Sequence, residues 1–460
     1  MSNPGSGSLF GGTFGRGFVR ADDQAWLQAM LDAEAALARA VERAGLAAAG
    51  AGAAVTTVAR AELFDVAELG RRAADAGNPV PALVRMLAGL LPADAAAAVH
   101  RGATSQDIID TAAMLLIRDA IDVIEAGLAA AARSAAALAA LHARTVMAGR
   151  TLLQQAVPVT FGLVAAGWLT AIDDARTGLR RVRAERLAVQ FGGAAGTLAA
   201  LGTDGPVVAE LFADELGLPA PDLPWHTDRL RIIDIAAALT AACAGAGKVA
   251  RDVTLLAQSE VGEVSEATGG GRRGGSSAMP HKRNPVAAIS LLGCAKRAPG
   301  LLATLAAAAE QEHQRAAGSW HSEWETIADL LRLTGSAVAW LADLLGGLTV
   351  DADRMRANLD AAGDLPLAES VATMLAPSLG HLAAHDLVAA ASRRAAADRS
   401  GLADALFADP ASAARLAAAG ISQEQVAAAL RPEASLGAAG QFIDRALRAH
   451  DACDARLDSG

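Results

Sequence analysis

Long stretches without proline constrain the fold of this chain more than any other sequence feature. Between Asp107 and about Leu141 there is no proline, and Gly127 is the only glycine. This stretch is far longer than the average globular helix of about 11 to 12 residues. Further proline-free stretches span about 166–189, 228–267 and 319–345. Helices of such length must pack lengthwise against other long helices, in the same chain or in a second subunit.

Composition also predicts an all-α fold. Hydrophobic residues make up 53% of the 460 residues, yet aromatic residues make up only 3% and tyrosine is absent. The apolar content is therefore mostly alanine, leucine and valine. Alanine and leucine favour helices, whereas strands favour β-branched and aromatic residues. Alternating strand patterns are correspondingly scarce.

The spacing of helix breakers predicts three domains. Asp22 and Asp23 stand where an N-cap belongs, and they precede an amphipathic helix that we expect to end near Gly45. Shorter segments continue to about His100, and segments shorten again from about Asp351. The predicted domains are an N-terminal helical domain at 1–109, a central long-helix bundle at 110–350 and a C-terminal helical domain at 351–460.

Charge and hydropathy narrow the classes of partner. The net charge of −10 excludes a broad basic surface for nucleic acid or anionic lipid. Residues 1–12 lack the basic and apolar regions of a secretory signal. The longest weakly polar run, 156–172, is shorter than the roughly 20 apolar residues of a membrane span. We therefore expect a cytoplasmic protein that binds neither nucleic acid nor a membrane.

The cysteines and histidines predict neither a disulfide framework nor a metal site. Cys243, Cys294 and Cys453 lie far apart, and no Cys-x-x-Cys spacing occurs. His313 and His321 are eight residues apart, and no carboxylate cluster has the spacing of metal ligands. We expect no metal and no cofactor.

The segment 269–286, GGGRRGGSSAMPHKRNPV, is the most informative one for chemistry. A run of glycines forms either a linker or a loop that closes on a ligand. Here a hydroxyl, three basic groups and an amide follow within nine residues, which a linker has no need of. A solvated basic turn is the alternative. The side chains concerned are those of Ser276, His281, Lys282, Arg283 and Asn284.

The segment 100–107, HRGATSQD, has the pattern of a helix start. Thr104 is placed to cap the helix, and Asp107 lies favourably in its first turn. Hydroxyls and free N–H groups at a helix N-terminus also bind carboxylates. Thr104 and Ser105 are therefore candidates for both roles.

The string GSSAMPHKRN at 275–284 resembles the signature of the fumarase/aspartase superfamily. Residues 100–107 and the string GRTLLQQAVP at 149–158 resemble its two other signature segments, so the resemblance spans about residues 10–390. It implies three largely α-helical domains. It also implies a homotetramer with a twenty-helix core and active sites shared between subunits.

Leu152 distinguishes branches of that superfamily. Fumarases and adenylosuccinate lyases have a histidine at this position, and leucine cannot transfer a proton or bind a phosphate. The surrounding residues most resemble the cycloisomerase branch. That resemblance implies metal-free conversion of the tricarboxylate 3-carboxy-cis,cis-muconate into 4-carboxymuconolactone in protocatechuate (β-ketoadipate) catabolism.

The resemblance also implies residue roles. Proton transfer would involve Ser276 and Lys282, and His100 is a further catalytic candidate. Amide, hydroxyl and cationic groups would bind the substrate carboxylates. The candidate substrate-binding residues are Thr104, Ser105, Gln106, Arg150, Gln154, Ser277, Met279, Asn284 and Arg315.

Several alternatives stay open at this point. The chain could be another lyase of the superfamily, such as an adenylosuccinate or argininosuccinate lyase, or a non-catalytic helical scaffold. Residues 225–229, WHTDR, form either a site or a surface polar cluster. Residues 192–196, GGAAG, lack the spacing of a phosphate loop, and we expect them to allow close packing between helices.

Overall fold

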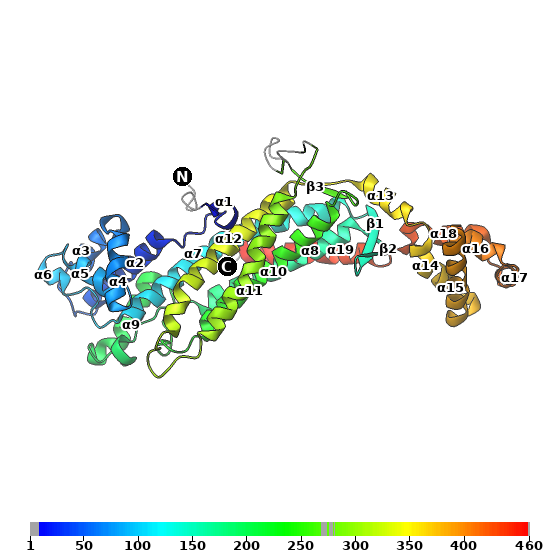
Figure 1. The fold of residues 1–460 in the computed structure, drawn as a ribbon. Helices are drawn as coiled ribbons and strands as arrows, with labels where there is room; N and C mark the ends of the chain where they lie inside the picture. Colours follow the sequence, from blue (N-terminus) through cyan, green and yellow to red (C-terminus); the bar gives the residue numbers. More distant parts are fainter. Residues whose placement is uncertain (1–8, 268–273, 276–278, 280, 459–460) are drawn as a thin grey trace. The chain divides into compact units, whose positions relative to one another are not determined.

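The computed structural model describes residues 9–267, 274–275, 279 and 281–458. Almost all of its regular structure is helical, which confirms the all-α prediction (Figure 1). The contacts divide the chain into two compact units. Unit 1 comprises 1–129, 174–247 and 289–342, and unit 2 comprises 130–173, 248–288 and 343–460. Each unit draws on separate stretches of sequence, and the division into three sequential domains stays a prediction.

Five long helices contribute residues to both units. They are α7 (Ser105–Leu141), α8 (Phe161–Arg186), α10 (Leu230–Leu256), α11 (Val286–Ala307) and α12 (Glu323–Gly346). Four of them match the proline-free stretches. The fifth, α11, has Pro299 in its interior, so the pattern did not reveal it. The helix predicted over 228–267 is shorter in the structure, because it ends at Leu256 and a strand follows.

The remaining helices of unit 1 come mostly from the N-terminal hundred residues, and α9 comes from the middle of the chain. Asp22 caps α2, since its Oδ1 accepts a hydrogen bond from the backbone N–H of Ala25 at 2.9 Å. The apolar face of α2 is buried, and the helix ends just before Gly45, as predicted. These helices are α1 (Gly11–Phe14), α2 (Asp23–Arg43), α3 (Ala51–Val58), α4 (Val66–Ala76), α5 (Val80–Ala88), α6 (Ala93–Ala96) and α9 (Gly205–Leu216).

Unit 2 contains two small antiparallel sheets and the C-terminal helices. Strand β1 (Val146–Thr151) pairs with β2 (Gln154–Thr160), and β3 (Val264–Glu266) pairs with β4 (Leu348–Val350). A core of leucine, valine and alanine side chains joins α14, α15 and α16. The C-terminal helices are α13 (Ala352–Ala361), α14 (Ala368–Leu379), α15 (His381–Asp398), α16 (Leu402–Ala408), α17 (Pro410–Ala418), α18 (Gln423–Ala429) and α19 (Ala439–Asp458).

The helices correct the prediction of which segment is most similar to a membrane span. By length and composition alone, α7, α10 and α11 could each cross a membrane. The run at 156–172 was thus not the strongest candidate, because alanine-rich helices reach high hydropathy without large side chains. In α11 only 28% of the most apolar window is buried inside the chain. This apolar surface is available for packing against a further element.

Candidate active site

The first turn of α7 presents two hydroxyl groups. Thr104 directly precedes the helix, and Ser105 is its first residue. Thr104 was expected to cap this helix, but its hydroxyl makes no capping bond; instead Oδ2 of Asp107 accepts from the backbone N–H of Thr104 at 2.9 Å. Across the described part of the chain, neither hydroxyl has a hydrogen-bond partner. Both are half-buried and available to a ligand.

Asp107 is fully buried and joins this turn to two other segments. Its Oδ1 accepts from the backbone N–H of Gly192 at 3.0 Å and lies 2.7 Å from Nε2 of His226. Its Oδ2 also accepts from the backbone N–H of Gly193 at 2.9 Å. The carboxylate can only accept, so Nε2 of His226 carries the hydrogen.

Glycine is required at position 192 for this arrangement. A Cβ there would lie 2.7 Å from Cε1 of His226, closer than atoms can pack. The glycines at 192 and 193 therefore pack against Asp107 and His226. The sequence interpretation expected packing between helices instead, because it could not show that a buried carboxylate would bind their N–H groups.

Arg315 lies beside the same turn. Its Nη1 donates to Oε1 of Gln106 at 3.0 Å, and its Nη2 donates to the carbonyls of Gly193 at 3.0 Å and Ala194 at 2.6 Å. Burial lowers the pKa of Arg315, and the charges of Asp107 and Asp110 oppose that effect. No carboxylate of the described residues lies within ion-pair distance of this guanidinium. Its positive charge is therefore not neutralised by a contact.

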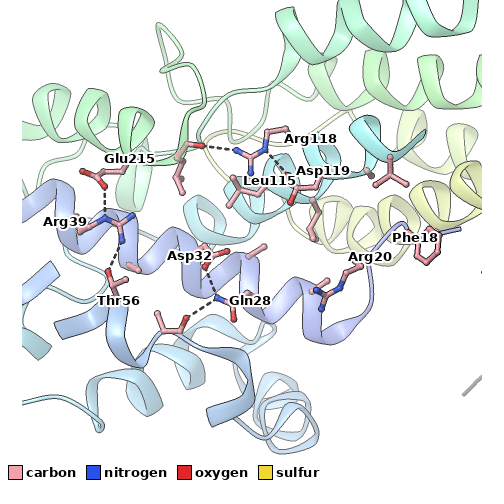
Figure 2. Close-up of a pocket in the computed structure, with 18 residues that line it drawn as sticks. Phe18, Arg20, Gln28, Asp32, Arg39, Thr56, Leu115, Arg118, Asp119 and Glu215 are labelled. Atoms are coloured by element: carbon pink, nitrogen blue, oxygen red, sulfur yellow. Dashed lines mark hydrogen bonds and ion pairs between the residues drawn. The ribbon is translucent and has the colours of Figure 1, made fainter. Parts of the chain in front are cut away.

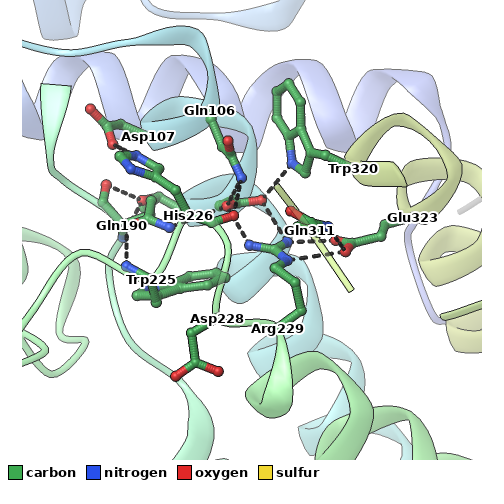
Figure 3. A network of polar contacts seen from close by, with 12 residues as sticks. Gln106, Asp107, Gln190, Trp225, His226, Asp228, Arg229, Gln311, Trp320 and Glu323 are labelled. Atoms are coloured by element: carbon green, nitrogen blue, oxygen red, sulfur yellow. Dashed lines mark hydrogen bonds and ion pairs between the residues drawn. The ribbon is translucent and has the colours of Figure 1, made fainter. Parts of the chain in front are cut away.

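A buried ionic network lies behind the turn (Figure 3). Arg229 donates to both oxygens of Asp110, at 2.8 and 3.0 Å, and to Oε1 of Glu323 at 3.0 Å. The two carboxylates outweigh burial and raise the pKa of Arg229. Trp320 donates to Asp110 at 2.9 Å, and Gln106 donates to it at 3.1 Å. The network fixes the helix that presents Gln106.

His100 stands in a strained conformation four residues before Thr104. Its φ is 57°, in the left-handed region that favours glycine. The buried carboxylate of Glu34 accepts from its backbone N–H at 2.9 Å and contacts its Nδ1 at 2.7 Å. Burial lowers the pKa of His100, but the hydrogen bond and charge of Glu34 outweigh it, so the pKa is raised. His100 therefore keeps its proton to a higher pH than a free histidine does.

The glycine-rich signature loop belongs to unit 2. Ser276 and Ser277 lie outside the described residues. Lys282 and Met279 are exposed, and Lys282 donates its backbone N–H to the carbonyl of Met279 at 3.0 Å. Among the residues described here, the Lys282 ammonium has no acceptor. The backbone N–H of Asn284 donates to Gly274 at 2.8 Å, which closes the base of the loop.

The β1–β2 hairpin presents the other predicted segment. Arg150 donates to both oxygens of the buried Glu263, at 2.9 and 2.6 Å. This bidentate pair gives Arg150 a structural task and leaves it less available to substrate. Gln154 is exposed on β2. Leu152 and Leu153 form the tip, with φ of 52° and 65° and exposed fractions of 97% and 74%.

The structure thus brings together the predicted residues of unit 1. Contacts join the α7 turn and Arg315 through Asp107 and His226, which the prediction of site residues did not include. Asp107 was predicted in the first turn of this helix, and the polar run at 225–229 was the sequence signal for His226. Their contact was not predicted, because 119 positions separate the two residues. Unit 1 contains His100, Thr104, Ser105, Gln106 and Arg315, and unit 2 contains Arg150, Gln154, Met279, Lys282 and Asn284.

A cavity of about 530 Å³ lies elsewhere in unit 1, between α2 and α7 (Figure 2). None of the predicted site residues lines it. Two arginines on its wall are paired, Arg39 with Glu215 at 2.6 Å and Arg118 with Asp119 at 3.0 Å. These two arginines are therefore engaged by carboxylates of unit 1.

Comparison with known proteins places the chain in a family. Residues 18–300 match the family described as Lyase. The chain is 50% identical over 429 residues to a 3-carboxy-cis,cis-muconate cycloisomerase of Bradyrhizobium diazoefficiens, covering 93% of this chain and 94% of the relative. It is 44% identical over 440 residues to a nitrosuccinate lyase of Streptomyces davaonensis, covering 93% and 91%.

A solved structure agrees with these relatives. The 3-carboxy-cis,cis-muconate lactonizing enzyme of Pseudomonas putida has a TM-score of 0.89 and 42% identity to this chain. The match covers 97% of this chain and 99% of that enzyme. The resemblance to the fumarase/aspartase superfamily is thereby confirmed. On sequence and on fold alike, this chain belongs to the lyase family.

Proposed function

We propose that this enzyme is a cycloisomerase that converts 3-carboxy-cis,cis-muconate into 4-carboxymuconolactone in protocatechuate (β-ketoadipate) catabolism. The main support is the activity for which several of its relatives are named. The cycloisomerase of Pseudomonas aeruginosa is 45% identical over 457 residues, with 98% of both chains covered. The site supports the proposal as well, because it offers cations and hydroxyls to an anionic substrate.

The reaction makes two demands on the protein. One carboxylate oxygen forms a bond to a carbon of the conjugated double bonds, and a proton adds to the carbon next to another carboxylate. The trianion therefore takes up one proton, supplied from solvent through a general acid, and becomes a lactone dianion. Ring closure within one molecule lets orientation lower much of the barrier. The site must neutralise carboxylates and place one proton.

Carboxylate binding falls to the α7 turn and Arg315. The hydroxyls of Thr104 and Ser105, with the N–H groups of that turn, suit one carboxylate. Arg315 binds only neutral oxygens, so its positive charge and a remaining N–H group can attract another carboxylate. Gln106 fixes the guanidinium. Further binding contacts are proposed for Gln154, Ser277, Met279 and Asn284. Arg150 would contribute less, because it is paired with Glu263.

Proton delivery falls to the signature loop. Ser276 matches the catalytic serine of the superfamily, and Lys282 is the nearest cation in sequence. A serine hydroxyl is a weak acid, so a nearby ammonium would assist it or deliver the proton itself. His100, whose pKa Glu34 raises, is a second acid.

We further propose a cytoplasmic homotetramer with shared sites. The support is the unburied apolar surface of α10 and α11, of which 50% and 28% of the most apolar window is buried. Long helices of that kind pack well against copies of themselves. Light scattering on the purified protein should give four times the chain mass of 46.4 kDa.

A second function is favoured by one relative. The nitrosuccinate lyase is nearly as similar as the cycloisomerases, and its reaction would use the same carboxylate-binding groups. The remaining alternatives are adenylosuccinate or argininosuccinate lyase, against which Leu152 argues, and a scaffold without activity.

The deciding experiment is an ultraviolet assay. The chelator-treated protein is mixed with 3-carboxy-cis,cis-muconate, whose diene absorbance disappears on ring closure. Rapid loss supports the cycloisomerase. No loss, together with nitrite release from 2-nitrosuccinate, supports the lyase. Inactivity on every substrate of a folded protein supports the scaffold.

A further inference from the structure

We propose that His226 is a positioning residue of the candidate active site. Through Asp107 it fixes the orientation of the Arg315 guanidinium and of the first turn of α7, and thereby the binding of substrate carboxylates. This inference rests on the proposed function, since it concerns the same site.

The contact between His226 and Asp107 is buried and short. His226 is 4% exposed and Asp107 is fully buried, with 2.7 Å between Nε2 and Oδ1. The other donors to Asp107 are backbone N–H groups at 104, 192 and 193. His226 is therefore the only side chain of the described residues that donates to this carboxylate.

Two routes of contact lead from His226 to Arg315. In the first, Asp107 binds the N–H of Gly193, and Arg315 donates to the carbonyl of the same residue. In the second, the carbonyl of His226 accepts from Nε2 of Gln106 at 2.8 Å, and Arg315 donates to Oε1 of that amide. Both routes hold the guanidinium by neutral oxygens.

These contacts predict an effect on binding rather than on chemistry. Neutral oxygens hold a guanidinium less firmly than carboxylates do, so a small shift of the 192–194 segment would turn Arg315 away. The Nε2 hydrogen of His226 is used by Asp107, which suits an orienting role. Loss of orientation weakens the ground state and the transition state alike, which raises KM and leaves kcat.

The test compares two substitutions of His226 with a matched control. Glutamine can still present an amide N–H near the position of Nε2, whereas leucine cannot donate. The control is His450→Gln, because His450 is also buried and contacts a carboxylate, that of Asp173, at 2.9 Å in unit 2. Kinetics are measured with 3-carboxy-cis,cis-muconate.

We expect His226→Leu to raise KM about 10- to 100-fold with kcat within about threefold, since charge-assisted contacts are worth that much. His226→Gln should recover most of the loss, and His450→Gln should match the wild type. A fall in kcat with unchanged KM in both His226 variants would assign His226 to proton transfer and overturn the proposal. Unchanged kinetics would overturn it as well.

Two additions keep the test decisive. If His226→Leu does not fold, His226→Asn is measured instead; its amide is polar but ends short of the position of Nε2, so it should raise KM in the same way. If the wild type does not turn over the muconate, the proposed function fails, and calorimetry with propane-1,2,3-tricarboxylate tests the positioning role separately. Equal affinity of His226→Leu and His450→Gln would then refute it.

Discussion

Arg315 differs from the other arginines of the candidate segments in its partners. Arg229 binds two buried carboxylates, and Arg150 binds Glu263. Arg315 instead binds an amide oxygen and two carbonyls. No carboxylate of the described residues pairs with its charge, and at the scale of single residues this supports the proposal that Arg315 binds substrate.

Arg315→Lys should therefore weaken substrate binding. Lysine keeps the charge but loses the planar guanidinium whose contacts with Gln106, Gly193 and Ala194 hold that charge in place. We expect KM to rise about 10-fold or more with a smaller change in kcat, measured by steady-state lactonisation. Arg354→Lys is the control, because Arg354 also donates to carbonyls, those of Val261 and Glu260, but in unit 2. Equal KM values for the two variants would contradict the assignment.

The His100–Glu34 pair predicts a pH-dependent stability. Because the pKa of His100 is raised above 6.5, its stabilising contribution is complete below about pH 6.5 and is lost as pH rises through the raised pKa. Glu34→Gln should thus reduce the free energy of unfolding by on the order of 1 kcal/mol more at pH 6 than at pH 9. Urea unfolding at both values measures this, and a difference independent of pH would argue against the pair.

The signature loop predicts a large kinetic effect. Ser276→Ala and Lys282→Met should each reduce kcat about 10²-fold, the usual effect of losing a positioned proton-transfer group. Stopped-flow absorbance of the muconate measures the turnover. If either variant keeps a near-normal kcat, the residue replaced in it does not transfer the proton.

At the scale of elements, helices were more predictable than strands. The proline-free pattern reports helices directly, and only Pro299 hid α11. The β1–β2 hairpin has Leu152 and Leu153 at its turn, where hairpins usually have asparagine and glycine, so no turn signal marked it. The contact between Asp107 and His226 could not be predicted, because it depends on packing between distant segments.

The hairpin tip predicts stabilisation by a conventional turn. Both leucines have positive φ, which costs a side-chain-bearing residue roughly 1–2 kcal/mol. Leu152→Asn combined with Leu153→Gly should raise the free energy of unfolding by about 1 kcal/mol or more, as urea denaturation would measure. A lower free energy of unfolding would show that contacts of the leucine side chains stabilise the protein by more than the backbone strain costs. Turnover and native mass of the same variant show whether the substrate or a second copy of the chain makes those contacts.

At the scale of the whole molecule, the apolar surface of α11 predicts assembly. Ile289 is 51% exposed on this helix. Ile289→Asp should reduce the native mass measured by light scattering, because burying a carboxylate between helices is costly. Leu382→Asp is the control, since Leu382 is 78% exposed on α15. A tetramer that persists in Ile289→Asp would exclude α11 from the subunit contact.

The sequence predicted the class of fold and most long helices, since both depend on local pattern and composition. The grouping of residues into two units is non-local and was not accessible from pattern. The roles of the signature residues came from resemblance, and only the structure distinguishes the engaged Arg150 from the available Arg315.

The three cysteines are buried and form no disulfide, and burial raises the pKa of the Cys243 thiol to about 11. Only an exposed thiolate reacts with alkylating reagents, so each thiol is protected while its surroundings stay closed. Cys243 and Cys294 belong to unit 1, and Cys453 belongs to unit 2. Timed alkylation followed by peptide mass spectrometry would thus report how often each unit opens under native conditions, without any added label.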